Sequence, residues 1–123
     1  MMKALWSKPT EDLGAKLETL VFLELIKTER EIYYLKENNM EVDFCVVSKG
    51  RASTLIQVCY DLSNPKTEER ESRSLFAFGK KYGVDELVIV TRDSSKEIRR
   101  NDKVIRVIPA YEFLIEENKK RVA

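Results

Sequence analysis

The chain contains no histidine, and this absence removes several kinds of catalytic site at once. It leaves no Ser-His or Cys-His nucleophile pair, no histidine-ligated zinc and no histidine acid–base catalysis. Cysteine is scarce as well, because Cys45 and Cys59 are too few for a four-thiolate metal site and do not indicate a secreted disulfide scaffold. The sequence also lacks an apolar run close to the ~20 residues that cross a bilayer, and it lacks a signal-peptide pattern. It therefore predicts a cytoplasmic protein with no membrane partner.

Charge of one sign is not in excess either. The 22 basic and 21 acidic side chains leave a net charge of +1, so contact with nucleic acid would need a local patch. The length of 123 residues suits one domain with one core. We predict a single domain over residues 1–123, with an N-terminal extension at 1–11 and a frayed tail at 118–123. Abundant Lys, Glu and Arg with scarce Gln and His is typical of thermophilic proteins.

Hydrophobic periodicity and turn residues predict an α/β fold. The expected elements are a helix at residues 12–28 capped by Thr10 or Asp12, strands at 31–36, 41–48 and 52–60, a helix at 67–82, strands at 87–90 and 104–108, and a helix from Pro109 to Glu117. The first three strands should form an antiparallel meander. The strand at 87–90 is apolar throughout, which is typical of a strand that is buried on both faces and parallel to a neighbour. Gly83 should end the second helix.

The candidate site lies on two neighbouring strands. Asp43 is unusual in the strand at 41–48, because aspartate is a poor strand former. Gln57, the only glutamine of the chain, and Cys59 lie two positions apart on the next strand and so point to the same face. Many Mg²⁺-dependent nucleases place an acid on one strand and a carboxylate and a lysine at this spacing on the next. Here an amide and a thiol stand in the last two positions, although a half-buried polar residue and a small core residue would fit them as well.

Whether Asp43 joins Gln57 depends on the turn between the strands. A three-residue turn at 49–51 would set Ser48 opposite Ala52 and Asp43 opposite Gln57. A two-residue turn would send the two side chains to opposite faces of the sheet. The site hypothesis therefore predicts the three-residue turn.

A metal site could form around these residues. Glu18, on the flank of the apolar stripe of the first helix, could reach a metal held by Asp43, although a solvated helix residue is the more frequent case. Mg²⁺ or Mn²⁺ would then have Asp43, Glu18 and the Gln57 carbonyl as ligands. The charge that a lysine supplies to a reacting phosphate would be missing at Cys59.

The second helix carries a basic stripe of Lys66, Arg70, Arg73 and Lys80 at helical spacing. Such a stripe could follow the phosphates of DNA. An ordinary exposed face is the interpretation we favour, because Glu68, Glu69 and Glu71 are interleaved and could pair with these cations.

Several segments together resemble a known family. They are residues 14–25, Tyr33-Tyr34, residues 41–44, residues 56–60, and later residues 80–83, 88–93 and 107–109. These segments resemble the uncharacterised C-terminal domain of archaeal and bacterial AAA-type ATPases, which is similar to the PD-(D/E)xK nuclease superfamily. The resemblance covers nearly the whole chain from Gly14 onward. It implies a restriction endonuclease-like α-β-β-β-α-β core, with a mixed sheet flanked by helices and an extra C-terminal strand and helix.

The resemblance also assigns roles to four positions. Glu18 matches the acid of the first helix and Asp43 the strand acid, whereas Gln57 and Cys59 stand where the family has its final acid and lysine. These departures favour a domain that has lost hydrolysis and serves as a binding or assembly module, with an ATPase or a second copy as partner. The alternatives are an active Mg²⁺-dependent DNA endonuclease with a relocated lysine, Lys49 or Lys36, and a purely structural protein–protein interaction domain. No phosphate-binding glycine loop of an ATPase is present in the chain.

Overall fold

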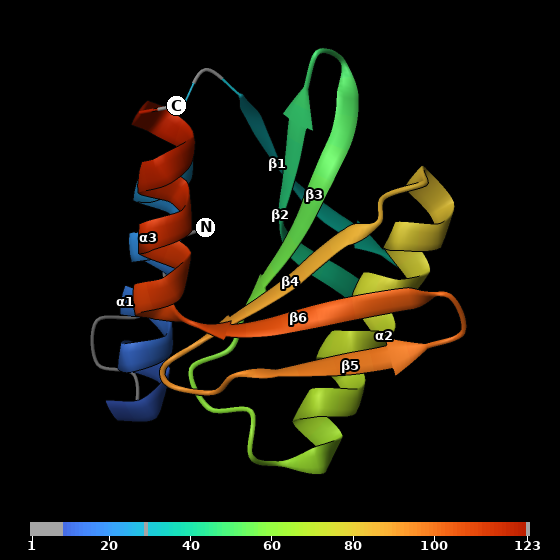
Figure 1. The fold of residues 1–123 in the computed structure, drawn as a ribbon. Helices are drawn as coiled ribbons and strands as arrows, with labels where there is room; N and C mark the ends of the chain where they lie inside the picture. Colours follow the sequence, from blue (N-terminus) through green and yellow to red (C-terminus); the bar gives the residue numbers. More distant parts are fainter. Residues whose placement is uncertain (1–8, 29, 123) are drawn as a thin grey trace.

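The chain forms one mixed sheet with helices on both faces (Figure 1). The structure is a computed structural model that describes residues 9–28 and 30–122. The elements in chain order are α1 (Pro9–Leu25), β1 (Glu31–Glu37), β2 (Met40–Ser48), β3 (Arg51–Val58), α2 (Pro65–Tyr82), β4 (Glu86–Thr91), β5 (Lys96–Arg100), β6 (Lys103–Pro109) and α3 (Ala110–Val122). The strand order is β1-β2-β3-β4-β6-β5. This arrangement confirms the predicted α/β class with a mixed sheet flanked by helices.

Two apolar clusters fill the space on the two faces of the sheet. One lies against α2 and includes Leu75 and Ile89. The other lies against α1 and α3, which run side by side on the opposite face, and includes Val21 and Phe113. Burial of each such side chain contributes about 1.5–3 kcal/mol. Within the described residues, no helix is both long and apolar enough to cross a membrane.

The first three strands form the predicted antiparallel meander. Asn38 and Asn39 form the turn between β1 and β2 with φ angles of 52° and 63°, a conformation that asparagine tolerates better than most residues. The predicted three-residue turn between β2 and β3 is wrong. Lys49 and Gly50 alone form it, with φ angles of 55° and 78°, and Ser48 pairs with Arg51.

A bulge in β3 compensates for the shorter turn. Val47 pairs with Ala52, but Val46 pairs with Thr54, so Ser53 is an extra residue in β3. Beyond the bulge Phe44 pairs with Ile56, and this register brings Asp43 beside Gln57. The strand relationship predicted for the site is therefore present, although it is produced by a different local structure.

The second half of the sheet is largely parallel. β4 pairs in parallel with both β3 and β6, and nearly all of its residues are buried, as its continuous apolar sequence predicts. The sequence analysis did not predict β5, an edge strand antiparallel to β6. Only Ile98 of β5 is half-buried, so the strand lacks the apolar alternation by which strands are recognised.

Several helix boundaries differ from the sequence predictions, and α1 ends at Leu25 and not at Thr28. α1 begins at Pro9, so Thr10 and Asp12 lie within the helix and not before it; residues 1–8 of the expected N-terminal extension lie outside the described part of the chain. α2 begins at Pro65, where the Asn64 side chain accepts a hydrogen bond from the Lys66 amide at 2.9 Å. It ends at Gly83 as predicted, with φ of 66°.

The predicted frayed tail is helical at residues 118–122. α3 begins after Pro109, the last residue of β6, and continues past Glu117 to Val122. Ion pairs hold this end of α3 against the rest of the domain. Lys120 pairs with Glu86 at 3.8 Å, and Arg121 pairs with Glu24 at 3.6 Å.

Candidate functional site

The site lies where β2 and β3 separate. Phe44 and Ile56 form the last backbone pair of the two strands on this side. Beyond that pair, side chains replace the backbone ladder. The Gln57 side-chain oxygen accepts a hydrogen bond from the Asp43 amide at 2.9 Å, and its amide nitrogen donates to the Glu41 carbonyl at 2.7 Å. Asp43 Oδ2 accepts from the Val58 amide at 2.8 Å.

Gln57 is held on both of its polar atoms and is only 1% exposed. A buried polar side chain needs hydrogen-bond partners, and this one must accept at one atom and donate at the other. An ionised carboxylate only accepts, so a glutamate here would face the Glu41 carbonyl without a proton to share. The Gln57 amide therefore joins the two strands.

A β-bulge in β2 directs Asp43 into the gap. Tyr33 of β1 pairs with Cys45, and Leu35 pairs with Val42, so Asp43 and Phe44 both lie opposite Tyr34. A bulge bends the strand and changes the direction of its side chains, which explains how a poor strand former is accommodated here.

Side chains from α1, β1, β2, β3 and α2 surround Asp43, and we call this site the acidic cleft. It consists of two adjoining depressions, both lined by Glu41, Asp43 and Glu71; the other lining residues are Glu18, Tyr34, Asn39, Phe44, Gln57, Val58, Arg70 and Ser74. Of the residues that the sequence proposes, Asp43 lines both depressions, Glu18 lines one of them and Gln57 lines the other. Glu71 and Arg70 were not predicted as site residues, because in the sequence the charges of α2 form one exposed face.

Local pKa shifts agree with an acidic and partly dry cleft. Burial raises the pKa of the Glu71 carboxyl, against the opposing effect of Arg70. The pKa of Tyr34 is also raised, first by burial and then by its hydrogen bond with Glu41 and by the charges of Glu41, Asp43 and Glu18. Each deprotonation here would add negative charge to a site that already contains several carboxylates.

Cys59 does not line the acidic cleft. Its thiol donates to the Asp61 carbonyl at 3.3 Å, and its side chain packs against the α2 cluster. Burial, with a smaller effect from Glu71, raises the thiol pKa to about 11. The thiol is therefore neutral near pH 7 and supplies no positive charge to a phosphate.

The expected metal ligands are only partly suited to a metal. Gln57 Oε1, the neutral ligand of that set, already accepts the Asp43 amide, and its second polar atom points to a carbonyl. Across residues 9–28 and 30–122, no group of three or more His, Cys, Asp or Glu side chains could hold a metal ion.

The two lysines that could replace the missing charge lie at different ends of β2. Lys49 is in the turn, six residues from Asp43 and thus about 20 Å along the strand. Lys36 lies at the rim of the cleft, with its amine 4.0 Å from Glu41 Oε1. Among the described residues that line the cleft, only Arg70 carries a positive charge, and it pairs with Glu71 at 3.7 Å.

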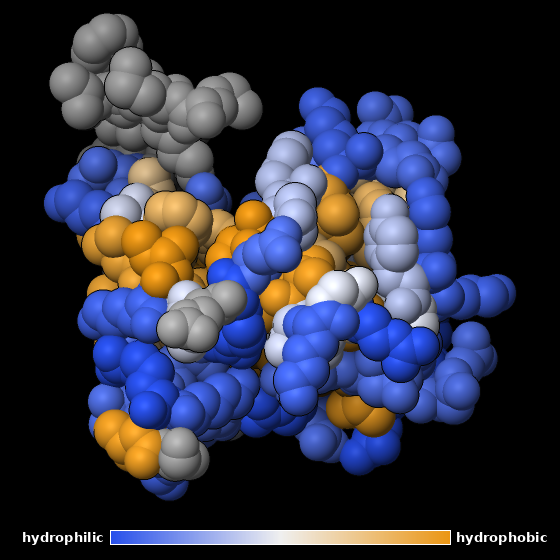
Figure 2. Space-filling view, turned by 90° about the horizontal axis from the view of Figure 1, so that it is seen from above, coloured by the Kyte–Doolittle hydropathy of each residue, from blue (hydrophilic) through white to orange (hydrophobic). Residues whose placement is uncertain are grey.

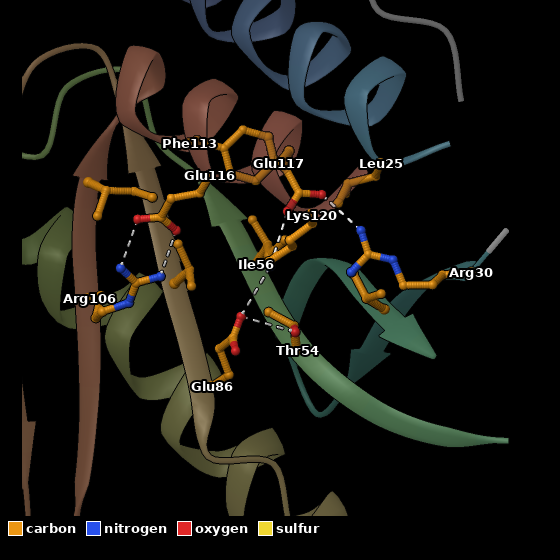
Figure 3. A pocket seen from close by; sticks show the side chains of 13 residues that line it. Leu25, Arg30, Thr54, Ile56, Glu86, Arg106, Phe113, Glu116, Glu117 and Lys120 are labelled. Atoms are coloured by element: carbon orange, nitrogen blue, oxygen red, sulfur yellow. Dashed lines mark hydrogen bonds and ion pairs between the residues drawn. The ribbon is translucent and has the colours of Figure 1, made fainter. Parts of the chain in front are cut away.

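A second polar pocket lies between α3 and the sheet (Figure 3). Its charged side chains are paired with one another. Arg30 pairs with Glu117 at 2.8 Å, and Arg106 binds Glu116 through two hydrogen bonds of 3.1 and 3.2 Å. Arg106 holds the pKa of Glu116 below its usual range. These ion pairs fasten α3 to the sheet and leave little unpaired charge for a ligand.

Comparison with known proteins identifies a family but no characterised relative. No curated protein and no solved structure matches the chain. Residues 13–113 match the model of one protein family, and this match covers most of α1, the whole sheet, α2 and the start of α3. The chain therefore belongs to the family described as Domain of unknown function (DUF4143).

Proposed function

We propose that this domain is a non-hydrolytic assembly module with a nuclease-like fold, and that it docks onto an AAA-type ATPase. The observation that carries the first half is the use of Asp43 and Gln57. Each bonds the backbone of the opposite strand at the position where a nuclease would hold its metal. The Cys59 thiol is neutral and donates to the Asp61 carbonyl. In this proposal the fold keeps the strand arrangement of a nuclease site, and the two side chains use it to join β2 to β3.

The docking surface that we propose is the apolar surface of α1, formed by Leu13, Leu20, Phe22, Leu23 and Ile26. These side chains are 38–48% exposed, whereas Leu17, Val21 and Leu25 of the same helix are buried. Exposed apolar side chains that gather on one helix mark a surface that a partner can cover. Figure 2 shows apolar surface emerging among hydrophilic residues on the left, the side of α1 and α3. The resemblance to an ATPase-associated domain supports the ATPase as the partner.

The loss of hydrolysis is tested with the purified protein, Mg²⁺ or Mn²⁺, and supercoiled, linear and branched DNA. We expect no cleavage above the background of the Asp43→Ala variant. Cleavage that disappears in Asp43→Ala would overturn the proposal.

Docking is tested by capture of a purified AAA-type ATPase from the same organism. We expect the wild type to retain the ATPase and the double variant Leu23→Ser/Ile26→Ser to lose it, because both side chains are exposed and their removal leaves the α1 core contacts in place. The control is Tyr111→Ser/Ile115→Ser, which changes exposed apolar residues of α3. Light scattering gives the oligomeric state: self-association that the α1 variant abolishes would mean that a second copy, not an ATPase, occupies the surface.

One observation favours the alternative of an active nuclease. Lys36 lies at the rim of the acidic cleft, next to Glu41. If Lys36 supplies the missing charge, metal-dependent cleavage should vanish in both Lys36→Ala and Asp43→Ala and persist in Lys49→Ala. The same nuclease assay therefore distinguishes the two functions.

A further inference from the structure

A second, basic groove lies on the opposite flank of α2 from the acidic cleft. Its lining includes Arg73, Phe76 and Lys80 from α2 and Arg100, Asp102 and Lys103 from the β5–β6 hairpin, and its volume is about 580 Å³. Four of these six side chains are cationic and one is anionic. A local concentration of positive charge is unexpected in a domain of net charge +1.

The glutamates of α2 neutralise only one cation of this groove. Glu68 pairs with Lys96 of β5, and Glu71 turns into the acidic cleft. Glu69 pairs with Arg100 at 3.2 Å. Within the described part of the chain, Arg73 and Lys80 have no acidic partner and are exposed. Two cations of the stripe are thus available to a ligand.

The other two cations are held in fixed positions on the opposite wall. Arg100 lies over the Phe76 ring, with its guanidinium carbon 4.9 Å from the ring centroid. The Lys103 amine donates to Asp85 at 2.8 Å and to the Val84 carbonyl at 3.3 Å. Asn101, with φ of 56°, forms the tight turn between them. Fixed cations lose less conformational entropy on binding an anion than free ones.

The dimensions and the floor of the groove indicate the ligand. Arg73 and Lys80 are seven residues apart on one helix, so they are separated by about 10 Å along its axis. Cations at this spacing match a ligand that carries more than one phosphate. The Arg100 guanidinium lies over the buried Phe76 ring and its side chain is 43% exposed, so the guanidinium is the surface on which a base can stack.

We propose that the basic groove binds nucleotides, either free or linked in a single strand, with phosphates on Arg73 and Lys80 and a base stacked on the Arg100 guanidinium. The site is separate from the acidic cleft, and the proposal does not depend on the proposed assembly function. A free nucleotide and a single strand present the same phosphate and base groups to the groove. The binding experiment distinguishes between them.

Binding is measured by fluorescence anisotropy with a labelled 12-nucleotide single strand and by competition with ATP. Single-strand binding with weak competition by ATP assigns the groove to a strand, and equal competition assigns it to free nucleotides. The salt dependence should be linear on a log–log scale, and each lost phosphate contact should reduce its slope by about 0.7. Competition by polyglutamate as strong as that by unlabelled strand would overturn the proposal, because it would show general anion attraction. Absence of binding at low salt would overturn it too.

The variants Arg73→Glu and Lys80→Glu should each weaken binding and flatten the salt dependence. Both side chains are exposed, so the fold should be retained, which circular dichroism checks. The matched control is Lys119→Glu, an exposed lysine of α3 on the other face of the sheet with the same change of charge. If the control weakens binding as much as Lys80→Glu, the groove is not the site.

Discussion

Gln57 and Asp43 hold the sheet together where the backbone ladder between β2 and β3 ends. The sequence predicted that the two residues would be neighbours, but from a three-residue turn, whereas the bulge at Ser53 sets the register that the structure has. It did not reveal their hydrogen-bond partners, since those are backbone groups whose direction depends on the bulge in β2. The sequence thus shows which functional groups lie at the site, but it does not show what those groups bind.

Replacement of Gln57 by Glu should destabilise the domain. The carboxylate would be buried against the Glu41 carbonyl, so the free energy of unfolding should fall by about 1–3 kcal/mol or more. Urea unfolding measures it. The control Asn118→Asp makes the same amide-to-carboxylate change at an exposed position and should stay within about 0.5 kcal/mol. Equal stability of Gln57→Glu and wild type would contradict the assignment of Gln57 as a donor.

Cys59 should react slowly with iodoacetamide near pH 8. Its thiol pKa of about 11 keeps it protonated there, so the rate should rise with pH and reach half of its maximum only near pH 11. Mass spectrometry of the modified peptide against pH gives the midpoint. The Glu71 charge raises this pKa, so Glu71→Gln should move the midpoint to lower pH. A midpoint near the ordinary thiol value of 9.0 would show that the thiol is not buried as described.

Among the elements, those with strong periodicity or strong caps were predictable. The apolar β4, the meander and the Gly83 end of α2 were all predicted from the sequence. β5 was missed because a strand of Lys, Glu and Arg at a sheet edge lacks an apolar face. The prediction of the β2–β3 turn was wrong because no residue type in the sequence marks the bulge at Ser53. Arg70 and Glu71 were missed because their contact with β2 is a tertiary contact.

The docking of α3 should depend on Glu117, which is 2% exposed and pairs with Arg30 and Lys120. Glu117→Gln removes the charge and leaves Arg30 without its ion pair, so unfolding free energy should fall by about 2 kcal/mol. Hydrogen exchange should show faster exchange across α3. Glu97→Gln, which breaks an exposed pair with Arg99, is the control and should have an effect below about 1 kcal/mol. Equal effects of the two changes would contradict a fastening role for the α3 ion pairs.

At the scale of the whole molecule, the sheet has two open edges, β1 and β5. β5 presents Lys96, Glu97, Arg99 and Arg100 in five residues, and charges on an edge strand oppose pairing with another sheet. The open edge next to the basic groove is therefore protected by its own sequence.

Removal of the charges from β5 should promote aggregation. The double variant Glu97→Val/Arg99→Val keeps the net charge at +1 and should aggregate at a lower temperature than the wild type, as light scattering during heating would show. Asp12→Val/Lys16→Val removes one acid and one base from the exposed pair of α1 and is the control. An unchanged aggregation temperature of the β5 variant would mean that the edge is protected in another way.

The separation of the acidic cleft from the basic groove makes the domain an electric dipole across α2. The small net charge therefore does not predict how the domain orients in an electric field. Near its isoelectric point of about 7.7, it can bind an anion exchanger by one flank and a cation exchanger by the other. A charged partner would approach the domain in a preferred orientation. The flank of α2 that it meets would therefore be set before the two proteins touch.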